Sequence, residues 1–163
     1  MQLKKLIMIR EISPITVPII KNGIISKVLL TDELQHKRVI IFGVPGAFTP
    51  TCSEKHLPSY IKLEKKLFSR GVDDIYCLSV NDDFVMNAWL LTYTEEHKII
   101  GIADGNGEIT KSLDLLVNKK KNFMGMRSTR FAMIVKNNLI EELFIEKPGE
   151  YKVSSAEHLL NKL

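Results

Sequence analysis

The most regular feature of the sequence is a set of short apolar runs, rich in β-branched residues, separated by longer segments of mixed polarity. Three of them have the continuous apolar character of strands buried on both faces of a sheet: Val39–Val44, Asp74–Val80 and Ile99–Asp104. Two later runs, Arg130–Lys136 and Leu139–Ile145, flank the pair Asn137-Asn138, which is typical of a two-residue hairpin turn. The pattern therefore predicts three buried strands followed by a β-hairpin.

The first helical pattern follows the first predicted strand. Apolar side chains recur on one side of Cys52–Arg70, from Leu57 to Leu67, and Gly71 after it is a typical helix stop. Pro58 lies inside this segment and has no N–H to donate, so we expect it to kink the helix. A long amphipathic helix with a break near its beginning is therefore predicted.

Three shorter helices are predicted downstream. The segment Asp82–Thr94 follows Asn81, a residue type that often caps helices. Its core-facing positions are expected to be Phe84, Val85, Trp89 and Leu90. Ile109–Val117 predicts a third helix, and Ser154–Leu163 predicts a last one, because it opens with the Ser-x-x-Glu spacing of a capping box.

The order of these elements determines the predicted fold. Strand and helix alternate three times before a hairpin and a closing helix. Parallel strands in the centre, an antiparallel edge and helices on both faces satisfy this order, so we expect an α/β protein with a thioredoxin-like fold, a central mixed β-sheet flanked by helices. The 163 residues include 45% apolar and 26% charged side chains and no repeat or linker, which predicts a single domain over residues 1–163.

Charge and composition argue against several classes of function. The net charge of +4 is scattered, and the one basic run, Lys119–Lys121, has no interleaved aromatic residues, so we expect no nucleic-acid partner. No apolar run is long enough to cross a bilayer, and the beginning, MQLKKLIMIREI, lacks the small-residue cleavage site of a signal peptide. Two cysteines do not make a disulfide framework, and we expect a cytoplasmic protein with no membrane partner.

One of the two cysteines stands in a chemically distinctive stretch, FGVPGAFTPTCSEKH. A thiol reacts as its thiolate, which needs nearby positive charge, oriented dipoles or hydrogen-bond donors. Pro50 is suited to the first turn of a helix, so the free N–H groups of that turn would point at the sulfur of Cys52. Thr49 adds a hydroxyl, and Gly46 allows the backbone to turn tightly beside it. These features predict a reactive thiol at Cys52.

Other interpretations of the cysteines and histidines have less support. Most free cysteines are inert buried side chains, and this describes Cys77, which lies among apolar residues in a predicted strand. The absence of a C-x-x-C motif argues against a disulfide exchanger. Cys52 and His56 could form a nucleophilic pair or half of a zinc site. No further ligands are evident, however, and we expect no metal and an exposed His56.

Three stretches, PGAFTPTCS, LSVND and MRSTRFAMIV, together resemble the type II, or peroxiredoxin-5-like, peroxiredoxins, and the resemblance runs from about Pro18 to the C-terminus. It implies a thioredoxin-fold thiol peroxidase that reduces hydrogen peroxide and organic hydroperoxides through a sulfenic acid on Cys52, with no metal, haem or flavin cofactor. It also implies a homodimer. The main alternative from another class is a redox-sensing or chaperone-like partner protein that uses oxidation of Cys52 as a signal.

The resemblance further implies a role for each residue of the motif. Cys52 matches the peroxidatic cysteine, Thr49 the threonine whose hydroxyl contacts thiolate and peroxide, and Pro45 the proline that shields the site from water. Arg130 matches the strand arginine that stabilises the thiolate and polarises the peroxide. Gly46 and the backbone amide of Cys52 fall where the family binds the substrate oxygens.

Two departures from the family pattern bear on how the cysteine is regenerated. Members that use an internal resolving cysteine carry it near the C-terminal helix, but the matching stretch EYKVSSAEHLL has none, and Val153 is its nearest counterpart. A one-cysteine cycle is therefore predicted, with the sulfenic acid reduced by glutathione and glutaredoxin or by thioredoxin. Cys77 matches a second cysteine of glutaredoxin-using members. A buried strand thiol needs local unfolding to reach Cys52, so we expect Cys52 alone to be essential.

Overall fold

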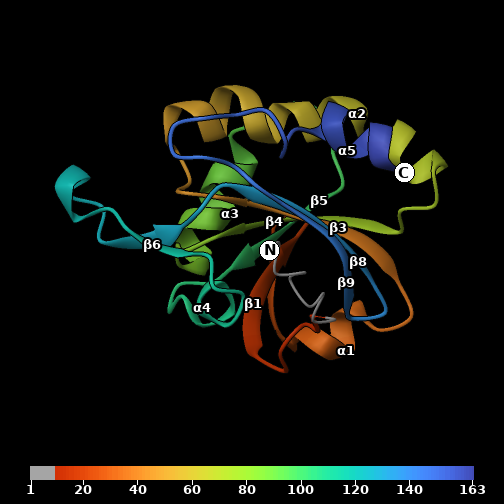
Figure 1. Ribbon diagram of the computed structural model, residues 1–163, viewed down its shortest axis with the longest axis horizontal. Coiled ribbons are helices and arrows are strands. Elements are labelled where there is room, and N and C mark those ends of the chain that lie inside the picture. The colour runs from red at the N-terminus through yellow and green to blue at the C-terminus, as the bar shows by residue number, and fades with distance from the viewer. Residues whose placement is uncertain (1–9) are drawn as a thin grey trace, which may run out of the picture.

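A mixed seven-stranded sheet organises residues 10–163, the part of the chain that the computed structural model describes (Figure 1). Its strands are β1 (Thr16–Lys21), β2 (Ile24–Leu29), β3 (Arg38–Val44), β4 (Asp74–Ser79), β5 (Ile99–Ala103), β8 (Phe131–Lys136) and β9 (Leu139–Ile145). They lie in the order β2-β1-β5-β4-β3-β8-β9, with β3, β4 and β5 parallel and the other neighbours antiparallel. A separate antiparallel pair consists of β6 (Leu116–Asn118) and β7 (Met126–Ser128).

Helices cover both faces of the large sheet (Figure 1). One face carries the π-helical turn η1 (Cys52–His56), α2 (Leu57–Ser69), α3 (Asp83–Leu91) and α5 (Ala156–Lys162). The other face carries α1 (Leu30–Leu34) and α4 (Glu108–Ser112). Side chains of β3 alternate between these layers, so Phe42 packs under the first face and Ile41 under the second. The predicted α/β class, a mixed sheet flanked by helices, is confirmed.

The turns of the two hairpins consist of residues whose backbone φ angles are positive, in the left-handed region. Asn137 and Asn138 have φ angles of 46° and 66°, which confirms the predicted two-residue turn between β8 and β9. The hairpin of β1 and β2 is not among the predicted elements, although Asn22-Gly23 gives the same turn signal, with φ angles of 51° and 76°. Pro18 lies inside β1, and a proline weakens the strand signal because it cannot donate to the ladder.

The predicted cap and core positions of α3 need correction. The Asp82 side chain accepts a hydrogen bond from the Val85 N–H at 2.9 Å, so Asp82 is the N-cap in place of Asn81. The side chain of Asn81 instead accepts from the Ala47 N–H at 3.0 Å, which ties α3 to the loop after β3. Phe84 points outward with 78% of its surface exposed, so it is not a core residue.

The long helix begins with a wide turn at the position where we expected a kink. In η1 the backbone N–H of Leu57 donates to the carbonyl of Cys52, the spacing of a π-helix, and Pro58 follows in the first turn of α2, where a missing N–H is tolerated. The disturbance is thus a change of helix type rather than a bend in a regular helix.

Two more predicted helices begin or end differently. Ser155 caps α5 by accepting from the His158 N–H at 3.2 Å, and Ser154 does not form the predicted capping box because its hydroxyl donates to Glu146. The helix predicted over residues 109–117 ends at Ser112, because Asp114 adopts a left-handed φ of 58° and Leu116 and Val117 belong to β6.

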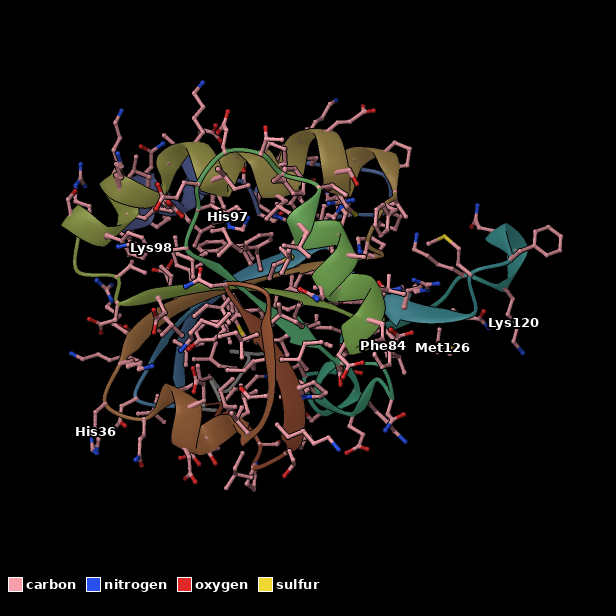
Figure 2. All side chains as sticks on the ribbon, turned by 180° about the vertical axis from the view of Figure 1, so that it is seen from behind. His36, Phe84, His97, Lys98, Lys120 and Met126 are labelled. Carbon is pink, nitrogen blue, oxygen red and sulfur yellow. The ribbon has the colours of Figure 1, made fainter. Side chains whose placement is uncertain are left out.

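The β6–β7 pair extends away from the main sheet and is joined by the short 3-10 turn η2 (Lys120–Asn122). Lys120 lies at the tip of this extension (Figure 2). Within residues 10–163, no helix combines the length and apolar character needed to span a membrane. The beginning of the sequence, where we expect no signal peptide, falls largely outside the described residues.

Candidate active site

The candidate active site forms where the end of β3 meets the beginning of β8. These strands pair antiparallel, with Gly43 opposite Phe131, so the residues just after β3 and just before β8 share one edge of the sheet. Arg130 therefore faces the segment that carries Cys52, and its Nη2 donates to the Cys52 Sγ at 3.2 Å. Because Cys52 is fully buried, this contact is shielded from bulk water.

A histidine that we expected at the surface lies on the other side of Arg130. His56 is fully buried, with its Nδ1 at 2.9 Å from Arg130 Nη1 and its Nε2 at 2.9 Å from the carbonyl oxygen of Ser154. Burial, together with the positive charge of Arg130, lowers the pKa of His56 to about 3 against the opposing effect of the Ser154 hydrogen bond. The expectation of an exposed histidine is wrong. Its hydrogen bond goes to Arg130, so the structure provides no evidence for a cysteine–histidine nucleophilic pair.

The loop between β3 and η1 carries the other predicted site residues. The Thr49 hydroxyl donates to the Gly46 carbonyl at 2.7 Å, so its proton is committed there and its oxygen is left free to accept a hydrogen bond. A Cβ atom on Gly46 would lie 3.0 Å from Arg127 Nη1 and 3.2 Å from Thr49 Cγ2, which leaves no easy room for a side chain. Pro45 and Arg130 both line an adjacent cavity of about 210 Å³.

Arg127 is the other arginine near the site and the rival for the cationic role. Its Nε donates to the Met124 carbonyl at 2.9 Å, and its guanidinium lies against Gly46. Within the described residues, the hydrogen bond to the sulfur comes from Arg130. The geometry therefore favours Arg130 as the partner of Cys52.

Two aromatic side chains that the sequence interpretation left out of the site hold the turn that carries Cys52. The Trp89 Nε1 donates to the Ser53 Oγ at 3.0 Å, and the Tyr93 hydroxyl donates to the Ser53 carbonyl at 2.7 Å. The only sequence signal is that Trp89 and Tyr93 have a helical spacing, which gives no indication of what they contact. Their hydrogen bonds anchor the first turn of η1 to α3 and the residues after it.

Cys77 lies in β4 on the same side of the sheet as Cys52. It is fully buried, it pairs with Phe42 across the β3–β4 ladder, and both cysteines belong to one core cluster. Burial, and to a lesser extent the neighbouring Cys52, raise the pKa of the Cys77 thiol. Cys77 is therefore a neutral, unpaired thiol at physiological pH.

Within residues 10–163, the remaining histidines make no hydrogen bond to Cys52 or Arg130. His36 and His97 occupy different parts of the molecule (Figure 2), and the ring of His158 packs edge-on against Phe144 at 4.9 Å. In the part of the chain that the structure describes, no three or more His, Cys, Asp or Glu side chains are arranged to hold a metal ion.

Comparisons with known proteins agree with the geometry. The family model described as Redoxin matches residues 12–160. The chain is 45% identical over 161 residues to Peroxiredoxin-2D of Arabidopsis thaliana, an alignment that covers 93% of this chain and 99% of that protein. The chain belongs to the type II, peroxiredoxin-5-like peroxiredoxins. It is therefore an enzyme, a thiol peroxidase of the oxidoreductase class.

Solved peroxiredoxin structures share the whole fold. Reduced Prx3 from Vibrio vulnificus in complex with H₂O₂ has a TM-score of 0.88 and 39% identity, over 96% of this chain and 95% of that one. The Plasmodium falciparum antioxidant protein, a 1-Cys peroxiredoxin, has a TM-score of 0.87 and 30% identity, over 95% of this chain and 98% of that one. These likenesses confirm the predicted thioredoxin-like fold.

A buried carboxylate ties the segment after β9 to the site of this peroxiredoxin. The Glu146 oxygens accept from the backbone N–H groups of Lys152, Val153 and Ser154 at 2.6, 3.2 and 3.1 Å, and from the Ser154 hydroxyl at 2.7 Å. Burial by itself raises the pKa of Glu146, but the hydrogen bonds outweigh it and lower the pKa below its usual value. The closed loop presents the Ser154 carbonyl to His56.

Replacing Glu146 by glutamine is expected to destabilise this peroxiredoxin by about 1–3 kcal/mol at pH 7, because an amide nitrogen cannot accept and leaves buried N–H groups unpaired. The folded-state pKa of Glu146 is lowered, so its ionised form stabilises the protein above the unfolded glutamate pKa of about 4.3. This contribution is lost as the pH falls from there through the folded-state pKa. The free energy of unfolding of the wild type should therefore decrease more steeply in that acid range than that of Glu146→Gln.

Urea unfolding, followed by the fluorescence of Trp89 at several pH values, measures both effects. Glu150→Gln is the matched control, because Glu150 lies in the same loop but makes only an exposed ion pair with Lys152 at 3.7 Å. The control should change stability by less than about 0.5 kcal/mol. Equal losses in the two variants would contradict the role given to Glu146.

Proposed function

We propose that this thiol peroxidase reduces hydrogen peroxide and organic hydroperoxides at Cys52, in a cycle that uses no other cysteine of the chain. The observation that carries the proposal is the 3.2 Å contact between Arg130 Nη2 and the Cys52 Sγ inside a buried site. A guanidinium at this distance stabilises a thiolate and can also donate to an oxygen that approaches the sulfur. An inert cysteine that only fills space in the core gains nothing from a guanidinium beside its sulfur.

In the first step the Cys52 thiolate attacks one oxygen of the peroxide. The S–O bond forms while the O–O bond breaks, and the O–O electron pair leaves with the second oxygen, which takes up the proton that the Cys52 thiol lost on forming the thiolate and departs as water or an alcohol. The sulfur is oxidised by two electrons to a sulfenic acid. We assign to Pro45 the role of shielding the reacting atoms from water. The groups that we assign to the peroxide oxygens are Arg130, the Thr49 hydroxyl and the backbone amides of Gly46 and Cys52.

Two external thiols complete the proposed cycle. The first condenses with the sulfenic acid to a mixed disulfide and releases water, and the second reduces that disulfide and regenerates the Cys52 thiol. Glutathione with glutaredoxin, or thioredoxin, supplies these thiols. The stretch Glu150–Leu160 contains no cysteine, and Cys77 is buried with a raised pKa, which supports a one-cysteine cycle. The similar Plasmodium falciparum protein is described as a 1-Cys peroxiredoxin.

A Cys77→Ser variant is expected to keep steady-state turnover within about two-fold of the wild type, since a buried neutral thiol is a poor nucleophile. The measurement is peroxide-dependent NADPH oxidation coupled to glutathione and glutaredoxin, and separately to thioredoxin. Loss of turnover with both donor systems would show that Cys77 takes part in the cycle.

The proposal as a whole is tested by trapping the sulfenic acid. Pre-reduced protein receives one equivalent of hydrogen peroxide together with a sulfenate-specific reagent, and the reaction is quenched and analysed by intact and peptide mass spectrometry. An adduct on Cys52 within seconds is expected, whereas no modification on that time scale would overturn the proposal. A loss of two hydrogens that links Cys52 to Cys77 would keep the peroxidase and replace its recycling. Slow regeneration by every thiol donor would favour a redox-sensing role.

We also propose that the enzyme is a cytoplasmic homodimer. Three exposed apolar side chains belong to the active-site loop, to α3 and to β7: Phe48, Phe84 and Met126. The hydrogen bond between Ala47 and Asn81 links this loop to the beginning of α3, and Phe84 and Met126 lie at the same end of the molecule (Figure 2). Such a patch favours association with a second copy. Sedimentation velocity tests the dimer, and cell fractionation tests the compartment, which must keep thiols reduced for the cycle to run.

A further inference from the structure

We propose that His56 is a positioning residue for Arg130. Its Nδ1 accepts a hydrogen bond from the guanidinium and so fixes the plane in which Arg130 meets the sulfur and the incoming peroxide. This inference rests on the proposed function of Cys52 and Arg130. It gives His56 no contact with the peroxide and assigns its effect entirely to the orientation of Arg130.

The contacts form a continuous chain from the sulfur to the C-terminal loop. Arg130 Nη2 is 3.2 Å from the Cys52 Sγ, and Arg130 Nη1 is 2.9 Å from the Nδ1 of His56. A guanidinium is planar, so two partners on its two terminal nitrogens determine the rotation of the whole group. Cys52 and His56 stand at the two ends of the π-helical turn η1, and Arg130 bridges them.

The tautomer of His56 follows from its partners. A guanidinium has only N–H donors, so the Nδ1 that faces Arg130 must carry a lone pair. The single proton of the neutral ring then lies on Nε2, which donates to the Ser154 carbonyl at 2.9 Å. A second proton on Nδ1 would point at the positive guanidinium, which agrees with the lowered pKa of His56. The acceptor that faces Arg130 is therefore retained across the working pH range.

Its neighbours hold the imidazole of His56 in one orientation, so it can fix the orientation of the long, flexible Arg130 side chain. Its ring centroid lies 4.9 Å from the ring centroid of Phe42, 5.7 Å from that of Tyr60 and 5.2 Å from that of Tyr151. The Ser154 carbonyl, which accepts the hydrogen bond from Nε2, also accepts one from the Tyr60 hydroxyl at 2.7 Å. A fully buried hydrogen bond with a rigid acceptor is not exchanged for water, so it constrains Arg130 more than a surface contact does.

Two conservative substitutions separate positioning from simple packing. The side-chain amide of asparagine reaches the place of Nδ1 and can accept from Arg130, but it cannot reach Ser154. The amide of glutamine reaches the place of Nε2 and can donate to the Ser154 carbonyl, but it leaves Arg130 without its acceptor. If His56 only fills space and anchors the C-terminal loop, glutamine is the better replacement. If it positions Arg130, asparagine is better.

We expect His56→Gln to slow the reaction of Cys52 with hydrogen peroxide about ten-fold, less than the 10²–10³-fold that follows loss of a direct donor to the transition state. His56→Asn should stay within about three-fold of the wild type, because Arg130 keeps its acceptor. Stopped-flow fluorescence of Trp89, which contacts Ser53 beside the sulfur, gives the rate constants. Equal losses in the two variants, or a larger loss in His56→Asn, would overturn the inference.

Coupling to Arg130 provides a second readout. In an Arg130→Met background, His56→Gln should cause almost no further loss of rate, because the group that it positions is gone. Additive losses would mean that His56 acts independently of Arg130 and would contradict the proposal.

A third measurement needs no variant. Two-dimensional NMR of the wild type labelled with ¹⁵N-histidine reports which ring nitrogen carries the proton, and we expect the Nε2–H tautomer for the buried ring. An Nδ1–H tautomer would exclude a hydrogen bond accepted from Arg130 and would overturn the inference even if both variants failed to fold. Failure of the proposed function is distinguishable, because the wild type would then show no reaction of Cys52 with peroxide at all.

Discussion

A Cys52→Ser variant is expected to lose peroxide reduction entirely, to the rate of the uncatalysed background. In the proposed mechanism the sulfur supplies both the nucleophile and the two electrons that reduce the peroxide, and a serine hydroxyl supplies neither at neutral pH. The substitution is close to isosteric, and the Arg130 guanidinium can donate to the new oxygen as it does to the sulfur. The fold should therefore survive, which circular dichroism and urea unfolding can check.

The measurement is consumption of hydrogen peroxide, and of an organic hydroperoxide, in the presence of glutathione and glutaredoxin. Cys77→Ser, the other single-cysteine variant of the chain, is the control and should remain active. Peroxide consumption by Cys52→Ser above the background without enzyme would remove Cys52 from the centre of the mechanism.

Replacing Arg130 by methionine is expected to reduce the rate constant for peroxide by about 10²–10³-fold. The variant loses the donor that lies 3.2 Å from the Cys52 Sγ. It also loses a positive charge that stabilises both the thiolate and the negative charge that develops on the leaving oxygen as the O–O bond breaks. It also leaves the Nδ1 of the buried His56 without its partner. Methionine has similar length and no charge, so the loss reports on electrostatics more than on volume.

Rapid-mixing measurements over a range of peroxide concentrations give the rate constant. Arg127→Met is the matched control, since that arginine bonds the Met124 carbonyl and leaves the Cys52–Arg130 contact intact. A larger loss in Arg127→Met than in Arg130→Met would reverse the roles of the two arginines.

The sequence predicted the parts of the fold that depend on local pattern. Runs of apolar, β-branched residues indicated β3, β4 and β5, and a pair of asparagines indicated the hairpin of β8 and β9, because strand burial and turn chemistry are properties of neighbouring residues. The hairpin of β1 and β2 was missed because Pro18 interrupts its signal. The predicted helix N-caps were wrong by one residue where either of two adjacent side chains, such as Asn81 and Asp82, could cap the helix.

In the candidate site, too, features that depend on neighbouring residues were predicted and contacts between distant parts of the chain were not. Local chemistry indicated a reactive Cys52, but no spacing in the sequence could connect it to Arg130, which reaches it only through the register of β3 and β8. The resemblance to a family supplied that pairing. His56 was misjudged because it ends the polar run Ser53–His56, and the groups that bury it, Tyr151 and the Ser154 carbonyl, come from the far end of the chain.

The complete burial of Cys52 has a consequence for the timing of the proposed cycle. A disulfide requires the two sulfurs to approach to about 2.05 Å, and a buried sulfur that is enclosed by η1 offers no such approach to a tripeptide or a protein thiol. The contacts that anchor η1 at Ser53 must therefore break once in every turnover before the mixed disulfide can form. The lifetime of the closed sulfenic acid is then set by the opening rate of one helical turn. In the proposed cycle a second peroxide competes with the reductant during that lifetime, so we expect tighter anchoring by Trp89 and Tyr93 to make the enzyme easier to inactivate by its own substrate.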